Sequence, residues 1–215
     1  SAGVVVTPTV TNTPTATRTP TSTAVITSTP TFTPTPTNAS GNVLTFTALA
    51  DARVSEASPT TNYGTSTTLQ ADGGAGTRQA SYIRFNASGI SSPIQSVKLR
   101  VFCTTNGTAN GPAVYLADNS WIESGAGSIN WNVQPAAISA VADNKGAIAA
   151  SSWVEYNVTS LVSGNGTYTF ALIADSTDGV VFSSREGGTA PQLIVEMQSG
   201  PAATFTFTQT ATATL

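Results

Sequence analysis

The carboxylates are the side chains of this sequence that could perform acid–base chemistry, because the chain contains no histidine and a single cysteine. Asp118 and Glu123 flank Trp121, and Asp175 and Asp178 flank a turn. Glycoside hydrolysis needs two carboxylates that face each other across a cleft, and no pattern marks either pair as facing. The missing histidine also excludes Ser-His-Asp and Cys-His nucleophiles. We therefore predict that the protein is not an enzyme.

The same composition disfavours a bound metal or cofactor. Imidazole ligands are absent, and Cys103 alone cannot build a thiolate cluster or an intrachain disulfide. The acidic residues do not have EF-hand spacing. We predict no metal and no cofactor. Cys103 alternates with Val97, Leu99 and Val101, so a buried, inert thiol is favoured over a reactive one.

The charge pattern argues against nucleic acid and membrane partners. Eight Lys and Arg stand against eleven Asp and Glu, for a net charge of −3, whereas both partners attract clustered cations. No apolar run approaches the roughly 20 residues of a membrane span, so membrane insertion is not expected. We predict three regions: an extended Thr/Pro-rich arm at 1–40, a β-sandwich domain at 41–199 and an extended Thr-rich tail at 200–215.

The central region is predicted to be all-β. Short alternating runs are separated by turn signals such as Asn106-Gly107 and Asn165-Gly166, which is typical of an antiparallel β-sandwich or jelly roll. A helical turn is expected at 159–162. The predicted strands are residues 44–48, 52–56, 68–71, 81–86, 96–104, 113–117, 153–158, 168–174, 180–184 and 193–197.

Several motifs follow one another through this region. They are Asp51-Ala-Arg-Val54, Asn62-Tyr63-Gly64, Trp121-Ile-Glu123 with Trp131, and Phe182-Ser-Ser-Arg185-Glu186. Together they resemble the DNRLRE domain, also classed as carbohydrate-binding module family 96, over about residues 44–198. The resemblance implies a β-sandwich without an active site and an extracellular or cell-surface location. It also implies a structural motif made of Asn62, Tyr63, Gly64, Trp121, Glu123, Trp131, Arg185 and Glu186.

The aromatic and charged motif residues allow two interpretations. Trp121, Trp131 and Trp153 could stack on sugar rings, but packing in the sandwich is favoured, and Trp153 is expected to point inward. Arg185 and Glu186 could bind a uronate or a hydroxyl group, but a structural ion pair is favoured.

Both flanking regions repeat threonine with a period of two. Every odd-numbered residue from 7 to 37 is threonine except Val25, and the tail alternates in the same way. In a β-strand this spacing places the threonines on one face, whereas polyproline II would distribute them around its axis. The threonines are candidates for O-glycosylation. The candidates in the arm are Thr7, Thr9, Thr11, Thr13, Thr15, Thr17, Thr19, Thr21, Thr23, Thr27, Thr29, Thr31, Thr33, Thr35 and Thr37.

Two functions fit these observations. The first is a non-catalytic secreted structural protein that assembles with other copies of itself, head to tail, into an extracellular filament through strand addition. Its assembly residues would be Val4, Val5, Val6, Ile26, Phe32, Phe205 and Phe207. The alternative is a carbohydrate-binding module on Thr/Pro linkers of a larger extracellular enzyme or adhesin, with a polysaccharide as its partner.

Overall fold

The computed structural model describes residues 25–32, 42–199 and 207–214, which fall into two compact units. One unit is the body, and the other is formed by the two terminal regions. The elements of the body are β2 (Val43–Thr47), β3 (Ala50–Ser55), β4 (Thr68–Ala71), β5 (Gln79–Ala87), β6 (Ile94–Cys103), β7 (Ala113–Ala117), η1 (Trp131–Val133), β8 (Asp143–Asn144), β9 (Ser152–Asn157), η2 (Thr159–Leu161), β10 (Gly166–Ile173), β11 (Val180–Ser183) and β12 (Gln192–Met197).

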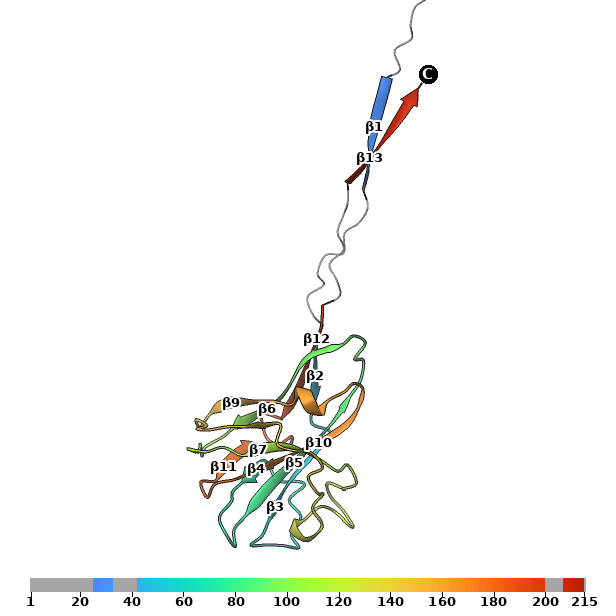
Figure 1. Ribbon diagram of the computed structural model, residues 1–215. Helices are drawn as coiled ribbons and strands as arrows, with labels where there is room; N and C mark the ends of the chain where they lie inside the picture. The colour runs from blue at the N-terminus through green and yellow to red at the C-terminus, as the bar shows by residue number, and fades with distance from the viewer. Residues whose placement is uncertain (1–24, 33–41, 200–206, 215) are drawn as a thin grey trace, which may run out of the picture. The chain divides into compact units, whose positions relative to one another are not determined.

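Two antiparallel sheets form a sandwich in the body (Figure 1). The five-stranded sheet has the order β3-β5-β10-β7-β8, and the six-stranded sheet has the order β2-β12-β6-β11-β4, with β9 also paired to β6. The predicted all-β sandwich is confirmed, and each of the ten predicted strands is present within a few residues of its expected ends. The helical turn is η2. The sequence did not predict β8 or η1. No described helix has the length and apolar character that a membrane crossing requires.

Alternating side chains of β6 show how the core forms. Val97, Leu99, Val101 and Cys103 are fully buried between the sheets, whereas the residues between them point away from the core. Because successive strand residues face opposite sides, this alternation assigns one face of the sheet to the core. Cys103 is buried, as expected, and burial raises the pKa of its thiol.

The other face of the five-stranded sheet is covered by the segment that follows β7. The strands present mostly small side chains there, and Trp121 and Ile129 pack onto them as part of a second buried cluster. Trp121 is only 6% exposed. Small residues leave room for an indole close to the strand backbone, so the alanines allow a segment with little regular structure to seal this face. The alanines of this cluster are Ala50, Ala52, Ala80, Ala117 and Ala171.

The second unit is a two-stranded ribbon made by the terminal regions. β1 (Val25–Phe32) pairs antiparallel with β13 (Phe207–Thr214). Threonine occurs at every second residue in both segments. Once one threonine lies opposite another, the next threonines along the two strands therefore also lie opposite each other. The threonine pairs are Thr27–Thr212, Thr29–Thr210 and Thr31–Thr208.

The ribbon bears on the assembly prediction. Residues 25–32 form an extended strand, and its strand partner is the tail of the same chain, where we expected a neighbouring copy. Ile26 and Phe32 lie in β1 and Phe207 lies in β13. The other predicted assembly residues, Val4, Val5, Val6 and Phe205, lie outside the described residues. So do the candidate glycosylation sites numbered below 24 or above 32.

Tyr156 offers a test of the core. Its side chain is fully buried and its hydroxyl has no hydrogen-bond partner among the described residues. A buried polar group without a partner costs about 1–3 kcal/mol. We expect Tyr156→Phe to leave the free energy of unfolding in urea unchanged or to raise it. Tyr82→Phe is the matched control, because the Tyr82 hydroxyl donates to Gln134 Oε1 at 2.9 Å. It should lower that free energy by about 1 kcal/mol. A large loss in Tyr156→Phe would contradict the unsatisfied hydroxyl.

The two units should also separate experimentally. A fragment of residues 42–199 retains both sheets and both buried clusters. We expect its free energy of unfolding to match that of the full chain within about 0.5 kcal/mol, because no core residue is removed. Denaturant unfolding followed by tryptophan fluorescence measures this directly, since all three tryptophans lie in the fragment. A fragment that does not fold would show that the flanking regions support the sandwich.

Candidate functional site

Asn62 connects the loop after β3 to the segment after β7. Its Nδ2 donates to the carbonyl oxygens of Glu123 and Ile129, both at 2.8 Å, and its Oδ1 accepts the Gly64 N–H at 3.2 Å. The amide therefore uses both of its donor hydrogens and its acceptor oxygen on the backbone. An aspartate here would lose both donor bonds, which explains the need for asparagine.

Arg185, in the segment after β11, forms the centre of a charged cluster. Its Nε and Nη2 donate to the two carboxylate oxygens of Glu123, each at 2.7 Å, and Nε also lies 2.9 Å from Glu186 Oε1. The two parallel hydrogen bonds to Glu123 form the strong, directional type of ion pair. They raise the pKa of Arg185. The geometry is that of the structural ion pair favoured on sequence grounds.

Asp51 lies beneath this ion pair in β3 and is almost completely buried. Its backbone N–H donates to Glu123 Oε1, and its Oδ2 accepts the Arg185 N–H, both at 2.7 Å. Burial raises the pKa of the Asp51 carboxyl to about 7, against the hydrogen bond from Arg185 that lowers it. Residues distant in sequence thus meet in one cluster that connects β3 with the segments after β7 and β11.

The remaining motif residues also have structural contacts. The Arg53 guanidinium lies 4.3 Å from the Tyr63 ring centroid, and Arg78 lies 5.6 Å from that of Trp131. Trp121 donates its indole N–H to Thr169 Oγ1 at 3.0 Å and lies in the core, the packing role that the sequence favoured.

The acidic pairs that could have formed a hydrolytic centre serve other purposes. Asp118 accepts the Ser120 N–H, whereas Glu123 is held by Arg185. Asp175 and Asp178 accept hydrogen bonds from neighbouring loops, each with its own set of donors. Their contacts are those of carboxylates that anchor loops.

An aromatic surface lies on the outward face of β6 and β9. The register places Trp153 opposite Phe102, and the ring centroids are 5.4 Å apart with an interplanar angle of 75°. Arg100 lies 4.2 Å from the Trp153 ring centroid. Trp153 is partly exposed, whereas its neighbour Val154 is buried. The expectation that Trp153 points inward was therefore wrong.

Charged side chains surround this aromatic pair. Glu155, also on the outward face, lies 2.9 Å from Lys98 Nζ and 3.5 Å from Arg100 Nε. The Lys98 ammonium holds the pKa of Glu155 below its usual range. Lys145 pairs with Asp143 at 2.7 Å. Three of the eight Lys and Arg residues of the chain are thus gathered around Trp153.

A hollow of about 270 Å³ adjoins Trp153. It lies between β9 and the segment before it, so its wall combines an indole, small apolar side chains and charged groups. Sugars have apolar C–H faces and polar edges, and sites that bind small ligands commonly combine these two kinds of lining. The lining residues are Lys145, Gly146, Ala147, Ile148, Ala149, Ser152, Trp153, Val154 and Glu155.

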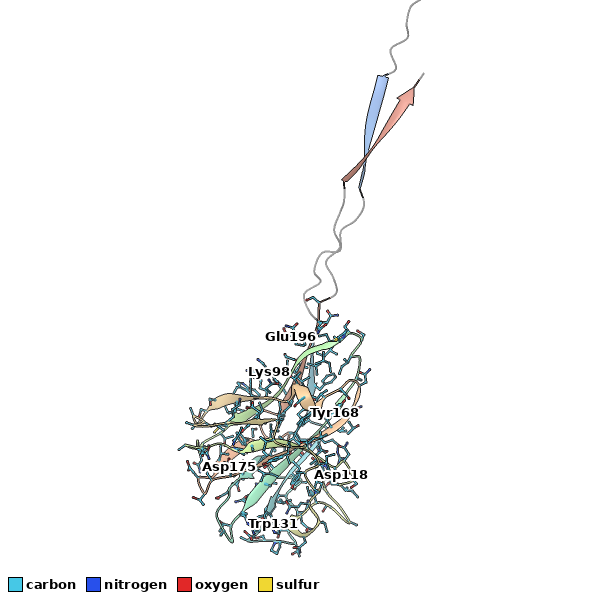
Figure 2. All side chains as sticks on the ribbon, in the orientation of Figure 1. Lys98, Asp118, Trp131, Tyr168, Asp175 and Glu196 are labelled. Carbon is cyan, nitrogen blue, oxygen red and sulfur yellow. The ribbon has the colours of Figure 1, made fainter. Side chains whose placement is uncertain are left out.

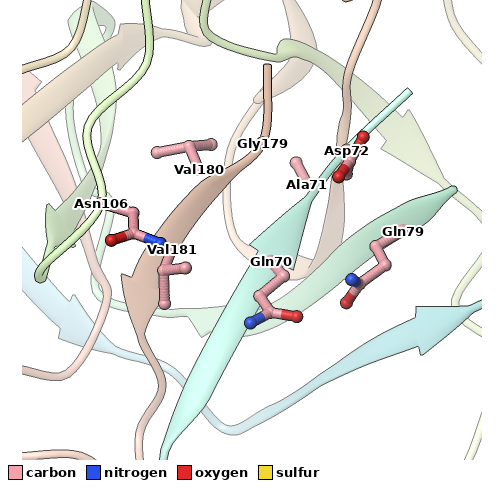
Figure 3. A pocket seen from close by; sticks show the side chains of 8 residues that line it. All are labelled: Gln70, Ala71, Asp72, Gln79, Asn106, Gly179, Val180 and Val181. Atoms are coloured by element: carbon pink, nitrogen blue, oxygen red, sulfur yellow. The ribbon is translucent and has the colours of Figure 1, made fainter. Parts of the chain in front are cut away.

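A second hollow, of about 280 Å³, lies across β4, β5 and β11 (Figure 3). Gln70, Gln79 and Asn106 bring three side-chain amides to it, and these amides make no hydrogen bond to any described residue. Asp72, Ala71, Gly179, Val180 and Val181 complete the wall. The amides could donate to and accept from sugar hydroxyls, but the lining contains no aromatic ring on which a sugar could stack.

The sequence contained a signal for the outward position of Trp153. Trp153 and Glu155 share one phase of the alternation in β9, and Val154 and Tyr156 share the other. A glutamate is rarely buried without a partner, so the phase that carries Glu155 is the outward one. The inward prediction for Trp153 followed from the large apolar area of the indole, which usually packs in the core.

Comparison with known protein families adds one finding. The family model for carbohydrate-binding module family 96 matches residues 42–197, which is most of the chain and all but the edges of the body. The comparison with curated proteins gave no match.

Gly64 provides a test of the cluster that connects the loops. A Cβ at this position would overlap the carbonyl oxygen and carbon of Glu123, both of which are backbone atoms. We expect Gly64→Ala to lower the free energy of unfolding by about 1–3 kcal/mol, because the segment after β7 must shift. Gly188→Ala is the matched control, since nothing lies within 4 Å of the added carbon. It should change that free energy by less than about 0.5 kcal/mol. Equal effects in the two variants would contradict the close approach.

Proposed function

Because the chain belongs to carbohydrate-binding module family 96, we propose that its body binds polysaccharide without catalysis through the surface around Trp153. The observation that carries the choice of surface is a partly exposed tryptophan beside a hollow of about 270 Å³. An indole face packs against the C–H face of a pyranose ring, and nearby charged groups bond to its hydroxyls.

The position of Trp153 on a strand supports this choice. Neighbouring strands hold the residues of the surface in fixed register, since Phe102 pairs with Trp153 and Arg100 pairs with Glu155. A rigid platform loses little conformational entropy when a ligand binds. The Arg100 contact and the edge-on Phe102 ring further restrict the indole.

The proposal places the protein outside the cell or on its surface. Carbohydrate-binding modules bind polysaccharides there. The Thr/Pro-rich arm also has the composition of an extracellular linker. In this setting the arm is a spacer between the module and a larger enzyme or adhesin, and its threonines are candidates for O-linked sugar.

Filament assembly remains a prediction and is not our main proposal. It required the arm to add as a strand to another copy, whereas β1 pairs with β13 of the same chain. That pairing uses the backbone hydrogen-bonding groups along one edge of each strand. The family match supports a binding module and carries no information on assembly.

Retention on insoluble polysaccharides tests the proposed surface. We expect Trp153→Ala to lower the affinity of the full chain by about tenfold or more, because a stacking contact worth more than about 1.4 kcal/mol is removed. Trp131→Ala is the matched control, since Trp131 is also partly exposed. It contacts Arg78 and lies well apart from Lys98, which belongs to the proposed surface (Figure 2). Its affinity should not change. Circular dichroism establishes that both variants are folded.

Two outcomes would contradict parts of the proposal. If Trp153→Ala binds normally while Gln70→Ala and Gln79→Ala do not, the sugar binds in the amide-lined hollow and the choice of surface is wrong. If the wild-type chain is retained on no polysaccharide in a panel of neutral, acidic and amino-sugar polymers, the binding function itself is wrong.

A further inference from the structure

Three carboxylates from distant parts of the sequence meet around Arg185. Asp51 comes from β3, Glu123 from the segment after β7 and Glu186 from the segment after β11. One carboxylate oxygen of each residue lies within 4.8 Å of those of the other two. Arg185 is the basic side chain that pairs with this cluster, so three carboxyl groups surround one guanidinium.

Two oxygens of the cluster are buried without a partner. Asp51 Oδ1 and Glu186 Oε2 accept no hydrogen bond from any described residue, although the second oxygen of each carboxylate is bonded. The Asp51 residue is only 1% exposed and its side chain points into the cluster. A buried carboxylate oxygen without a donor is costly, and buried charges in proteins are normally paired or coordinate a metal.

We propose that Asp51, Glu123 and Glu186 bind one divalent cation that prefers oxygen ligands, with Ca²⁺ as the best match. Ca²⁺ lies about 2.3–2.6 Å from each ligand oxygen, so two of its ligands are at most about 5 Å apart. The carboxylate oxygens of the cluster satisfy this limit. Carboxyl groups that coordinate a cation are ionised, and with all three ionised the cluster and its guanidinium carry a net charge of −2, which balances the ion.

The available oxygens define the role of each residue. Asp51 Oδ1 and Glu186 Oε2 are free to coordinate, and Glu123 would share a carboxylate oxygen that already accepts from Arg185. The ion would thereby connect β3 with the two segments that Arg185 also connects. No residue of the cluster lies in β9, the strand that carries Trp153, so the cation proposal does not rest on sugar binding there.

The first experiment measures thermal unfolding of the full chain after metal removal by EDTA, with and without added CaCl₂. A ligand that binds the folded state at a hundredfold excess over its Kd contributes about 2.7 kcal/mol. That energy corresponds to a rise in Tm of roughly 5–10 °C for a domain of this size. Isothermal titration calorimetry with CaCl₂ should give one ion per chain. A wild-type chain with neither a Tm rise nor binding heat would overturn the proposal.

Variants locate the ion. Asp51→Asn and Glu186→Gln preserve shape and remove one charge each, so either change should abolish the calcium-dependent rise in Tm. Asp178→Asn is the matched control, because Asp178 accepts from Thr108 and Ala109 outside the cluster, and it should retain the rise. If Asp51→Asn does not fold, Glu186→Gln decides the matter. A rise that persists in Glu186→Gln would place the ion elsewhere and contradict the assignment.

A shared proton is the competing explanation for the two unpartnered oxygens. In that case Asp51→Asn would be as stable as the wild type or more stable, and neither protein would respond to calcium. This outcome would overturn the cation site. Polysaccharide retention by Glu186→Gln should match the wild type with and without EDTA, so failure of the cation proposal can be distinguished from failure of the proposed function.

Discussion

The bidentate ion pair between Arg185 and Glu123 is the interaction that anchors the long segment between β7 and β9 to the rest of the body. The segment from β7 to β9 contains one short 3-10 helix and a two-residue strand, so side-chain contacts supplement its limited backbone pairing with β7. Arg185 anchors this segment at Glu123, and Asn62 bonds to its backbone at two points. Each of these groups loses its partner if the other moves, and Glu123, whose side chain is only 15% exposed, would then keep its charge in a largely shielded position without a counter-ion.

The two faces of the sandwich are used differently because of this arrangement. The outer face of the five-stranded sheet carries small residues and is sealed by Trp121 and its segment, which leaves it unavailable to a ligand. The outer face of the six-stranded sheet keeps Phe102, Trp153 and their charged neighbours partly exposed. Trp121 thus covers the outer face of one sheet, whereas Trp153 forms part of the exposed outer face of the other. The family membership is the basis of our proposal that the exposed surface binds polysaccharide.

The strand content could be predicted from the sequence because a period of two is a local property. Residues 97–101 alternate apolar and basic side chains, and burial keeps alternating through residue 103 although Phe102 is apolar; a half-buried strand produces this period of two. β8 could not be predicted, since it pairs over two residues with β7 and has no periodicity of its own. Trp153 was assigned to the wrong face because the assignment followed the large size of the indole, although Trp153 shares its phase in β9 with Glu155, which marks the outward face. The carboxylate cluster could not be predicted either, since its members are more than sixty residues apart and no regular spacing in the sequence relates them.

By itself the sequence determined the fold class, the ten main strands of the body, the absence of histidine chemistry and the threonine parity of both flanks. These properties depend on residue type and on neighbours one or two positions away, so they can be observed without knowing the fold. Only the tertiary structure decided which partner the arm's strand takes and which carboxylates meet at Arg185. The physical reason is that contacts across a sandwich are set by strand order and register, which join residues far apart along the chain and leave no local trace in it.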